Sequence, residues 1–412
     1  MRVAELIFAF GLVPCSFASL PPSTQDPILA SSSKLLLGRD LVDFHKSLVE
    51  IESISGNEKA VGDWLYESLK SQGYNAEKQY VSNDPERFNV YAWPGDKREA
   101  PVILSSHIDT VPPFLPYKYT KHEKNNTIFG RGSVDAKGSV ATQVIAVNEL
   151  MSKSAINPND VAVLYVVGEE VGGAGMQKAN DLNLTPKTVI FGEPTELKLV
   201  SGHKGILQVV LTAKGKAAHS GYPWLGRSAN EVLVSALAAI MQLGDKLPQS
   251  DKYGTTTFNI GRMQGGVANN VVAQDAKAQI AVRIAEGTPA LIEKEVTIAV
   301  HDAVKDFLIK DDLKAEDIIT IDFSGAGYGP IDIDHDVPGF DVMTVNYGTD
   351  IPWLNKTVKD QKRYLYGPGT IFVAHSDHEE LKEQDLYDAV EGYKKIVLHA
   401  LGKGGEGGRE DL

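Results

Sequence analysis

The stretch VAVLYVVGEEVGG, Val161 to Gly173, is apolar for seven residues and then places two adjacent glutamates among glycines. A short valine-rich run bounded by glycine is typical of a strand that is buried on both faces of a parallel sheet. Open α/β sheets place their sites just beyond the carboxyl ends of such strands. The stretch therefore predicts a buried strand that delivers Glu169 and Glu170 to a site at the edge of a sheet.

Similar apolar runs alternate with helical patterns on either side of this stretch. FNVYAW (88–93), PVILSSHID (101–109) and TVIFGEP (188–194) have the length and composition of strands, and a helix is expected from about Gly138 to Ser154. Alternation of strands and helices is the pattern of an α/β layer with a mainly parallel sheet. We expect IFVAHS (371–376) to be a further strand of this layer.

A different rhythm begins at about Ser201. The order becomes strand, helix, strand, strand, helix, strand, which is that of a small ferredoxin-like α+β unit with one sheet face under two helices. The α/β pattern then resumes, so an inserted domain explains the chain better than a tandem one. We predict an α/β catalytic domain over residues 30–200 and 325–402, an inserted lid or dimerisation domain over 201–324, and a disordered tail over 403–412.

Composition narrows the class of protein. A chain of 412 residues is long enough for two domains, and 42% hydrophobic with 23% charged residues is typical of a soluble globular protein. The formal net charge of −13 argues against nucleic acid and anionic membrane surfaces as partners.

The N-terminus has the pattern of a secretory signal. Arg2 precedes the apolar run LIFAFGLVP, and the small residues Ser16 and Ala18 follow at the positions of a cleavage site. The run is shorter than the roughly 20 residues that a membrane span needs. We therefore predict a signal peptide over residues 1–18 and a secreted protein. The single cysteine lies inside this segment, and three glycosylation sequons fit the same route: Asn125, Asn183 and Asn355.

Residues that can bind a metal recur at the ends of the expected strands and before the expected helix. Each has an ordinary explanation when taken alone, such as a surface histidine, a helix cap or a turn. Five independent segments that all supply a ligand-type side chain are better explained by a metal site. The candidates are His107 with Asp109, Asp135, Glu169 with Glu170, Glu193, and His375.

Six ordered motifs resemble the M20 family of co-catalytic zinc peptidases, which includes carboxypeptidases, desuccinylases, deacetylases and aminoacylases. The motifs are SSHIDTVPP, GRGSVDAKG, VGEEVGG, FGEPTE, AHSGYPWLGRSA and AHSDHEE, and the resemblance extends from about Leu41 to Leu401. It implies two zinc ions per subunit. His107, Asp135 and Glu193 would hold one ion, and Asp135, Glu170 and His375 the other, with Asp135 as the bridge. The resemblance also implies a cis peptide bond after Asp135.

The two adjacent glutamates are expected to have different tasks, because neighbouring side chains of an extended strand point to opposite faces. The resemblance makes Glu170 a ligand and leaves Glu169 beside the water as general base. Asp109 would accept the remaining ring N–H of His107 and so fix its tautomer.

The inserted domain also holds candidate site residues. His219 resembles the family histidine that stabilises the tetrahedral oxyanion, which dimeric members take from the partner subunit, so a homodimer is allowed. Asn270 lies in the matching motif GGVANNVVA. Arg283 stands where some members bind a substrate carboxylate, with a structural ion pair as the alternative. Ala273 and Ala281 depart from the family pattern, which commonly has proline and aspartate there.

The remaining histidines are interpreted as outside the chemistry. His203 lies at the expected domain junction, where it either approaches the site or belongs to the hinge surface. The others are expected at the surface: His45, His122, His301, His335 and His399.

The leading interpretation is a secreted di-zinc exopeptidase, most simply a carboxypeptidase that hydrolyses a peptide bond near a free carboxylate. The alternative is an N-acyl-amino-acid amidohydrolase of the aminoacylase or deacetylase type, which would use the same metals. A third reading is a non-catalytic binding protein on the same scaffold. Such a protein would be expected to lack a ligand or the base, whereas all the expected positions here carry suitable residues.

Overall fold

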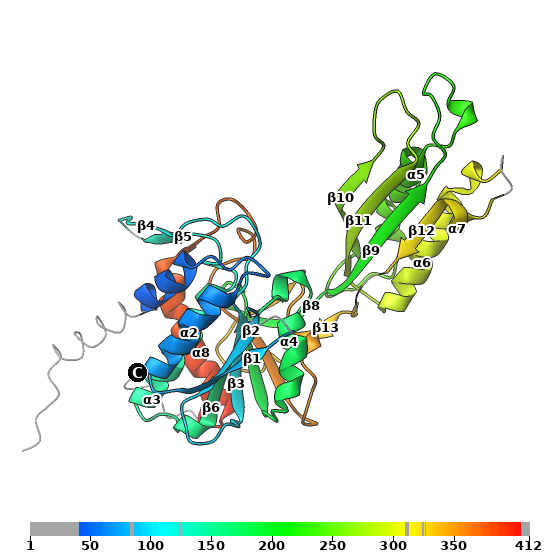
Figure 1. Ribbon diagram of the computed structural model, residues 1–412. Coiled ribbons are helices and arrows are strands. Elements are labelled where there is room, and N and C mark those ends of the chain that lie inside the picture. Colours follow the sequence, from blue (N-terminus) through cyan, green and yellow to red (C-terminus); the bar gives the residue numbers. More distant parts are fainter. Residues whose placement is uncertain are drawn as a thin grey trace, which may run out of the picture. The chain divides into compact units, whose positions relative to one another are not determined.

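The computed structural model describes residues 41–82, 86–123, 125–309, 313–323, 325 and 327–404. The predicted signal segment 1–18 lies outside the described residues, and so do residues 405–412 of the predicted tail. Figure 1 shows the described elements, which group around a six-stranded and a four-stranded sheet. Within the described ranges, no helix is both long and apolar enough to span a bilayer.

The six-stranded sheet has the order β1-β2-β6-β3-β7-β15. Its four strands β6, β3, β7 and β15 are parallel, and the edge pair β1 and β2 is antiparallel. The bounds are β1 Asn75–Tyr80, β2 Phe88–Trp93, β3 Val102–His107, β6 Val161–Val166, β7 Thr188–Gly192 and β15 Lys362–Tyr366.

The register of the parallel strands brings their carboxyl ends to one edge. His107 at the end of β3 pairs with Val166 at the end of β6, and Gly192 at the end of β7 pairs with Tyr366 at the end of β15. Residues that follow these strands therefore meet at the same edge, as the sequence predicted.

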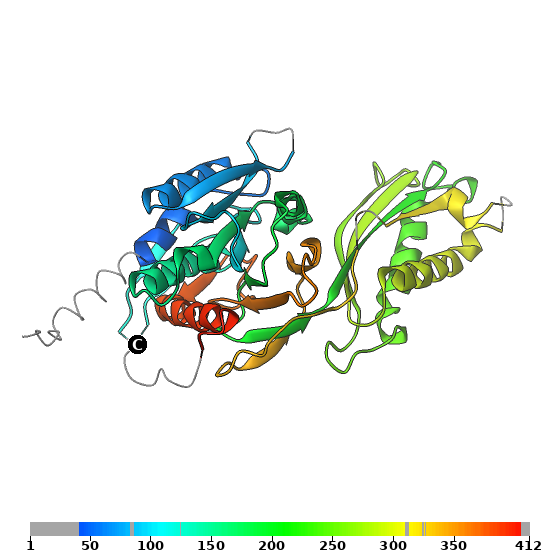
Figure 2. The ribbon, with the colours of Figure 1, turned by 90° about the horizontal axis from the view of Figure 1, so that it is seen from below.

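Both faces of this sheet are covered, because alternate side chains enter different cores. Leu104 and Val163 pack with residues of the helix over residues 41–50 and of α2 (Lys59–Ser71), α3 (Lys137–Ser152) and α8 (Glu383–Ala400). Ile103 and Leu164 pack with α4 (Ala174–Ala179) and with a small sheet of order β13-β8-β14. Figure 2 shows α3 and α8 side by side. The small sheet comprises β8 Leu199–His203, β13 Ile331–Asp332 and β14 Val342–Val345.

The four-stranded sheet has the order β10-β11-β9-β12, with neighbouring strands antiparallel. One face packs on α5 and α6, whereas the other carries polar side chains such as Gln208 and Lys277. The elements follow the order strand, helix, strand, strand, helix, strand. The fold class predicted from the sequence, an α/β layer with an inserted ferredoxin-like α+β unit, is confirmed. The bounds are β9 Gly205–Lys214, α5 Ala229–Met241, β10 Thr257–Gly265, β11 Asp275–Ile284, α6 Pro289–Ala303, α7 Ala315–Ile318 and β12 Ile319–Asp322.

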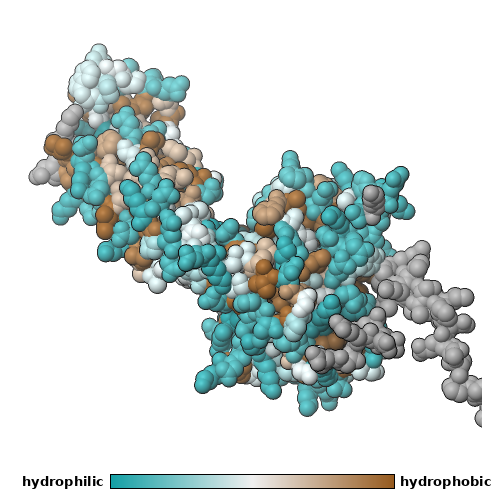
Figure 3. Space-filling view, turned by 180° about the vertical axis from the view of Figure 1, so that it is seen from behind, coloured by the Kyte–Doolittle hydropathy of each residue, from teal (hydrophilic) through white to brown (hydrophobic). Residues whose placement is uncertain are grey.

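On the face shown in Figure 3, hydrophilic residues predominate and apolar residues lie among them. The three sequon asparagines Asn125, Asn183 and Asn355 are all exposed. A second three-stranded sheet, of order β16-β5-β4, comprises β4 Lys118–Thr120, β5 Thr127–Phe129 and β16 Glu380–Lys382.

Two expectations are wrong. IFVAHS is not a strand: Val373 N donates to Thr370 O and Ala374 N to Ile371 O, so this segment is a series of turns that follows β15. β15 itself, KRYLY, begins with two charged residues, which hid its strand character.

His45 is not at the surface. It is fully buried, and its Nε2 lies 3.0 Å from the carbonyl oxygen of Ser133, while Nδ1 has no hydrogen-bond partner among the described residues. Burial lowers the pKa of His45 from 6.5 to about 4.

This burial predicts a pH-dependent stability. Because the pKa of His45 is lower in the folded than in the unfolded protein, its contribution is present above pH 6.5 and is lost as the pH falls toward 4. The difference in unfolding free energy between wild type and His45→Gln should therefore change by about 3 kcal/mol over this range. Denaturant unfolding at several pH values measures it. His122→Gln, at the exposed surface, is the control and should run parallel to wild type; a parallel His45→Gln curve would contradict the prediction.

Candidate metal centre

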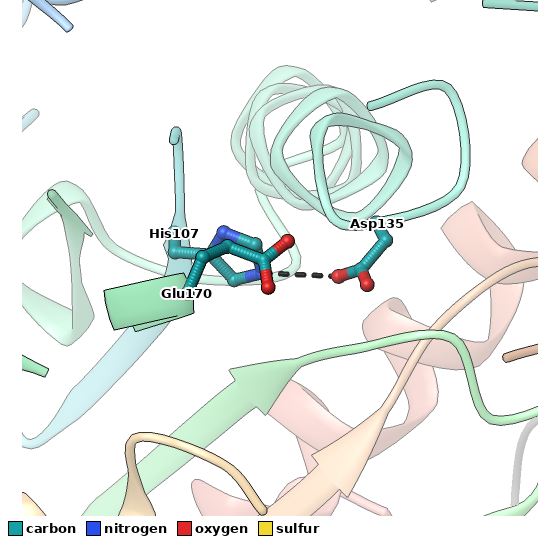
Figure 4. Close-up of side chains that lie close together, drawn as sticks. All are labelled: His107, Asp135 and Glu170. Carbon is teal, nitrogen blue, oxygen red and sulfur yellow. Dashed lines mark hydrogen bonds and ion pairs between the residues drawn. The ribbon is translucent and has the colours of Figure 1, made fainter. Parts of the chain in front are cut away.

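Five candidate ligands come from five separate segments at the carboxyl edge of the six-stranded sheet. His107 is the last residue of β3, and Glu193 directly follows β7. Asp135 lies in the turns before α3, and Glu170 lies in a 3-10 turn, Glu169–Val171, that begins after β6. His375 lies in the loop after β15 and has a left-handed backbone. Figure 4 shows that the side chains of His107, Asp135 and Glu170 point toward one another.

Asp135 stands between two histidines. Its Oδ1 lies 3.1 Å from His107 Nε2, and its Oδ2 lies 3.3 Å from His375 Nε2. On the first side, Glu193 Oε1 is 3.7 Å from His107 Nε2. On the second side, Glu170 Oε2 is 3.0 Å from His375 Nε2. The structure thus brings together two imidazole–carboxylate groups that share Asp135, which is the arrangement that the resemblance implies.

The cluster concentrates negative charge in a buried place. Although burial opposes its protonation, the charge of Glu193 and hydrogen bonds with Asp109 and Asp135 raise the pKa of His107 well above its usual value. Hydrogen bonds with Asp135 and Glu170 raise the pKa of His375 to about 10. Burial raises the pKa of Glu193 to about 7. Carboxylates outnumber imidazoles here, so a bound cation would offset charge that the two histidines leave uncompensated.

Glu169 and Glu170 face different partners, but not for the expected reason. β6 ends at Val166, so the two residues lie on a 3-10 turn rather than on a strand, and period-two geometry does not apply. Glu170 contacts His375. Burial, together with the charges of Glu193 and Asp350, raises the pKa of Glu169 well above its usual range.

Asp109 supports both His107 and the two glutamates. The carbonyl oxygen of Asp109 lies 3.0 Å from His107 Nδ1, whereas its carboxylate Oδ1 lies 3.5 Å away. The main-chain carbonyl is thus the nearer acceptor of this ring N–H, the expected carboxylate lies somewhat farther away, and Nε2 faces Asp135. The carboxylate also accepts from the amides of Glu169, at 3.1 Å, and Glu170, at 3.3 Å.

Hydrogen bonds to a buried glutamate fix the segment that carries Asp135. The peptide bond Asp135–Ala136 is cis, as the resemblance implies. The fully buried Glu379 accepts hydrogen bonds from the amides of Gly132, Val134 and Asp135 through Oε1. Its Oε2 pairs with Arg131 Nη1 at 2.6 Å. Glu379 belongs to the AHSDHEE motif, but the sequence alone indicates no role for it, because its partners lie about 245 residues earlier in the chain.

His219 and Asn270 lie together in the inserted domain. The two residues are exposed and stand on paired loops, where Ser220 N donates to Asn270 O at 3.0 Å. The Nδ1 of His219 accepts from Gly221 N, and its ring lies 6.1 Å from that of Tyr222. These contacts all lie within the inserted domain, and the same loops border a cavity of about 860 Å³.

Arg283 lies at the other end of the inserted sheet. It pairs in register with Ile206, whose backbone bonds to Tyr328 in the segment that returns to the α/β domain. A Cβ built on Gly348 would lie 3.2 Å from Arg283 Nη1, so the guanidinium reaches the loop that leads to Asp350. Arg283 therefore lies close in space to the α/β domain of its own chain.

Sequence reasoning also missed the groups around this loop. His203 is fully buried rather than at a hinge surface, with Nε2 3.1 Å from Thr349 Oγ1. Tyr328 and Asp350 carried no signal in the sequence beyond an ordinary aromatic and an Asp before a turn. A search for polar residues in the segments that flank the inserted domain could have found them.

A cluster of histidines and carboxylates at the carboxyl edge of a mainly parallel sheet is typical of hydrolases that use a metal. A family model described as a peptidase dimerisation domain matches residues 201–312. A probable carboxypeptidase of Uncinocarpus reesii is 47% identical over 406 residues, covering 90% of this chain and 89% of that protein. One of Emericella nidulans is 44% identical over 430 residues, covering 96% and 98%.

Solved structures share the fold. A tripeptidase from Staphylococcus aureus has a TM-score of 0.70 at 21% identity and covers 88% of this chain and 98% of its own. An M20 family metallo-carboxypeptidase from Sulfolobus solfataricus has a TM-score of 0.67 at 17% identity and covers 88% and 99%. The chain belongs to the M20 family of metallopeptidases and is a hydrolase.

The contacts of Glu379 give a testable prediction. Glu379→Gln would leave Arg131 buried without its charge partner, so the unfolding free energy should fall by about 3 kcal/mol or more. Denaturant unfolding measures this loss. Glu380→Gln, at the exposed neighbouring position, is the matched control and should stay within about 0.5 kcal/mol of wild type. A Glu379→Gln variant as stable as the control would contradict the role given to Glu379.

Proposed function

We propose that the protein is a zinc-dependent carboxypeptidase with two metal ions per subunit. The observation that carries the proposal is the placement of Asp135, whose two carboxylate oxygens face two different histidines. His107 and Glu193 would hold one ion with one oxygen of Asp135. Glu170 and His375 would hold the other ion with the second oxygen.

The residues fit zinc, because imidazole and carboxylate are its usual ligands in co-catalytic sites. Zinc bound there would lower the pKa of a water toward roughly 7 and polarise the amide carbonyl. The tautomer of His107 suits this role, since Nδ1 donates to the Asp109 carbonyl and Nε2 is free to bind.

Glu169 is the proposed general base. Its carboxylate interacts with the charges of His107, Glu193 and Glu170 without being a member of either imidazole–carboxylate group, and its raised pKa means that it takes up a proton more readily than an exposed glutamate. Glu169 would take a proton from the attacking water and pass it to the leaving nitrogen. Asp109 holds the Glu169 amide and so positions the base. His219 would stabilise the oxyanion, and Asn270 and Arg283 would bind the substrate.

The substrate assignment rests on the relatives. Proteins 44% to 47% identical to this chain are named probable carboxypeptidases. Arg283 beside the α/β domain also suits a substrate that ends in a free carboxylate. An N-acyl-amino-acid amidohydrolase would share these features, so the test must compare the two substrate classes directly.

The adjacent glutamates should fail differently when replaced. Glu169→Gln should keep two zinc ions and the fold but lose turnover by about 10²- to 10⁴-fold, because the base is lost. Glu170→Ala should lose zinc, because a ligand is lost. Elemental analysis and peptidase assays of both variants measure this. A zinc-replete Glu169→Gln enzyme with near-normal turnover would overturn the role of the base.

Substrate class is decided by incubating the zinc-loaded protein with unblocked peptides and with N-acetyl amino acids. Stepwise release of C-terminal residues from the peptides, with little hydrolysis of the acetyl compounds, is the expected result. Mass spectrometry of the products follows both reactions. Rapid hydrolysis of N-acetyl amino acids alone would favour the amidohydrolase.

Secretion and assembly are further parts of the proposal. The signal pattern of residues 1–18 and the exposed sequons Asn125, Asn183 and Asn355 support export and glycosylation. N-terminal sequencing of protein from culture medium checks cleavage after Ala18. The match to a peptidase dimerisation domain supports a homodimer, which the molar mass in solution checks.

A further inference from the structure

Asp350 is a buried aspartate with one carboxylate oxygen that has no hydrogen-bond partner in the described part of the chain. It is 5% exposed, and its Oδ1 is buried with no hydrogen bond from any described residue. It precedes the 3-10 turn Ile351–Trp353, yet its side chain does not cap that turn, since Ile351 N bonds to Thr349 Oγ1 at 3.2 Å. A buried carboxylate oxygen without a partner is costly, so this one is expected to meet a group that the protein does not supply.

The turn that follows Asp350 lies beside the turn that carries Glu169. Trp353, at the end of its own turn, packs against Gly173, where a Cβ would lie 2.6 Å from Trp353 Nε1. Gly173 N donates to Gly168 O at 2.8 Å, which closes the turn around Glu169. The charge of Asp350 adds to the effect of burial in raising the pKa of Glu169, in agreement with this placement.

The same loop lies against groups that suit an anion. Gly348, two residues before Asp350, lies against Tyr328 and Arg283: a Cβ there would overlap the Tyr328 hydroxyl and lie 3.2 Å from Arg283 Nη1. The Tyr328 ring packs on Trp353 with centroids 5.3 Å apart. A guanidinium, a hydroxyl and a carboxylate oxygen that lacks a hydrogen bond from any described residue are therefore gathered around three consecutive loop residues.

The chemistry of peptide hydrolysis creates a matching pair of charges. The water oxygen bonds to the carbonyl carbon, the C–N bond breaks, and both water protons end on the leaving nitrogen. At neutral pH the products are a carboxylate and an ammonium group. When the leaving group is a C-terminal residue, it becomes an amino acid whose ammonium and carboxylate groups are attached to the same carbon.

We propose that Asp350 binds the ammonium group of the released C-terminal amino acid, while Arg283 and Tyr328 hold its carboxylate. This inference rests on the carboxypeptidase function proposed above. A positive charge develops on the leaving nitrogen only as the bond breaks, so a carboxylate placed there favours bond breaking over simple substrate binding. Asp350 thereby selects substrates whose leaving group is an α-amino acid.

Calorimetric titration of the zinc-loaded full-length protein tests the subsite without turnover. The probes are L-leucine and 4-methylpentanoate, which differ only in the amino group. Wild type should bind L-leucine about tenfold or more tightly than 4-methylpentanoate, because only the amino acid can pair with Asp350. Wild type that binds both alike, or neither, overturns the proposal.

Variants of Asp350 test whether this residue causes the preference for L-leucine over 4-methylpentanoate. Asp350→Asn should reduce the ratio of the two affinities to about one and change binding of 4-methylpentanoate by less than about threefold. Asp350→Glu, which keeps the charge, should retain part of the preference, and circular dichroism checks the fold of both. Asp341→Asn, an exposed aspartate in the same segment, is the matched control and should behave as wild type. An undiminished preference in Asp350→Asn would assign the ammonium to another group, such as the metals, and overturn the proposal.

Two peptides distinguish a subsite for the ammonium group of the released amino acid from a subsite for the free N-terminus of a dipeptide substrate. Asp350→Asn should lower turnover of Gly-Leu and N-acetyl-Gly-Leu by the same factor, because both release leucine. Loss confined to Gly-Leu would show that Asp350 binds the free N-terminus and would overturn the proposal. Wild type that shows the Asp350-dependent preference in calorimetry but cleaves neither peptide would sink the carboxypeptidase function and leave the amino-acid subsite standing.

Discussion

The position of Asp135 between His107 and His375 is the contact on which the rest of the site depends. It requires three segments to meet: the end of β3, the turns before α3 and the loop after β15. Parallel register brings the first and third to one edge of the sheet. Glu379 then fixes the second segment. Its carboxylate accepts hydrogen bonds from the amides of Gly132, Val134 and Asp135, which lie in the turns that carry Asp135. The proposed metal ligands are therefore positioned by groups that are not themselves candidate ligands.

The same cluster around Asp135 carries more negative than positive charge. Asp135, Glu170 and Glu193 are largely buried, and Glu169 and Asp350 add two more carboxylates to the same region. Two imidazoles cannot offset this charge. Such an arrangement weakens folding, and carboxylates with perturbed pKa values of this kind cluster at functional sites. Cations bound at Asp135 would offset most of the charge, and the Asp350 oxygen that lacks a hydrogen bond from any described residue is the one that we assign to the substrate.

Much of this arrangement could be predicted because it is local in sequence. The apolar runs ending in His107, Glu170 and Glu193 each show strand and ligand within a few residues, and parallel strands must align their carboxyl ends. His375 was found by its motif, but its loop was mistaken for a strand, because IFVA is apolar and the charged start of β15 is not. The roles of three other residues could not be predicted from the sequence: Glu379, His45 and Asp350. Their burial depends on partners far away in the chain, and no local pattern distinguishes a buried carboxylate or imidazole from an exposed one.

The inserted sheet separates two sets of substrate-binding candidates. Arg283 pairs with Ile206 near the start of β9, beside the α/β domain, whereas His219 lies beyond the other end of this strand. β9 has 10 residues, which at about 3.3 Å per residue is roughly 30 Å of extended chain. Rotation of side chains cannot cover that length. The near end of the sheet can therefore serve the metal centre of its own chain as it stands, whereas His219 and Asn270 need either a large movement of the inserted domain or a second copy. A symmetric pair of chains would satisfy this requirement without any movement within the sheet, which links the proposed homodimer to the chemistry of the site.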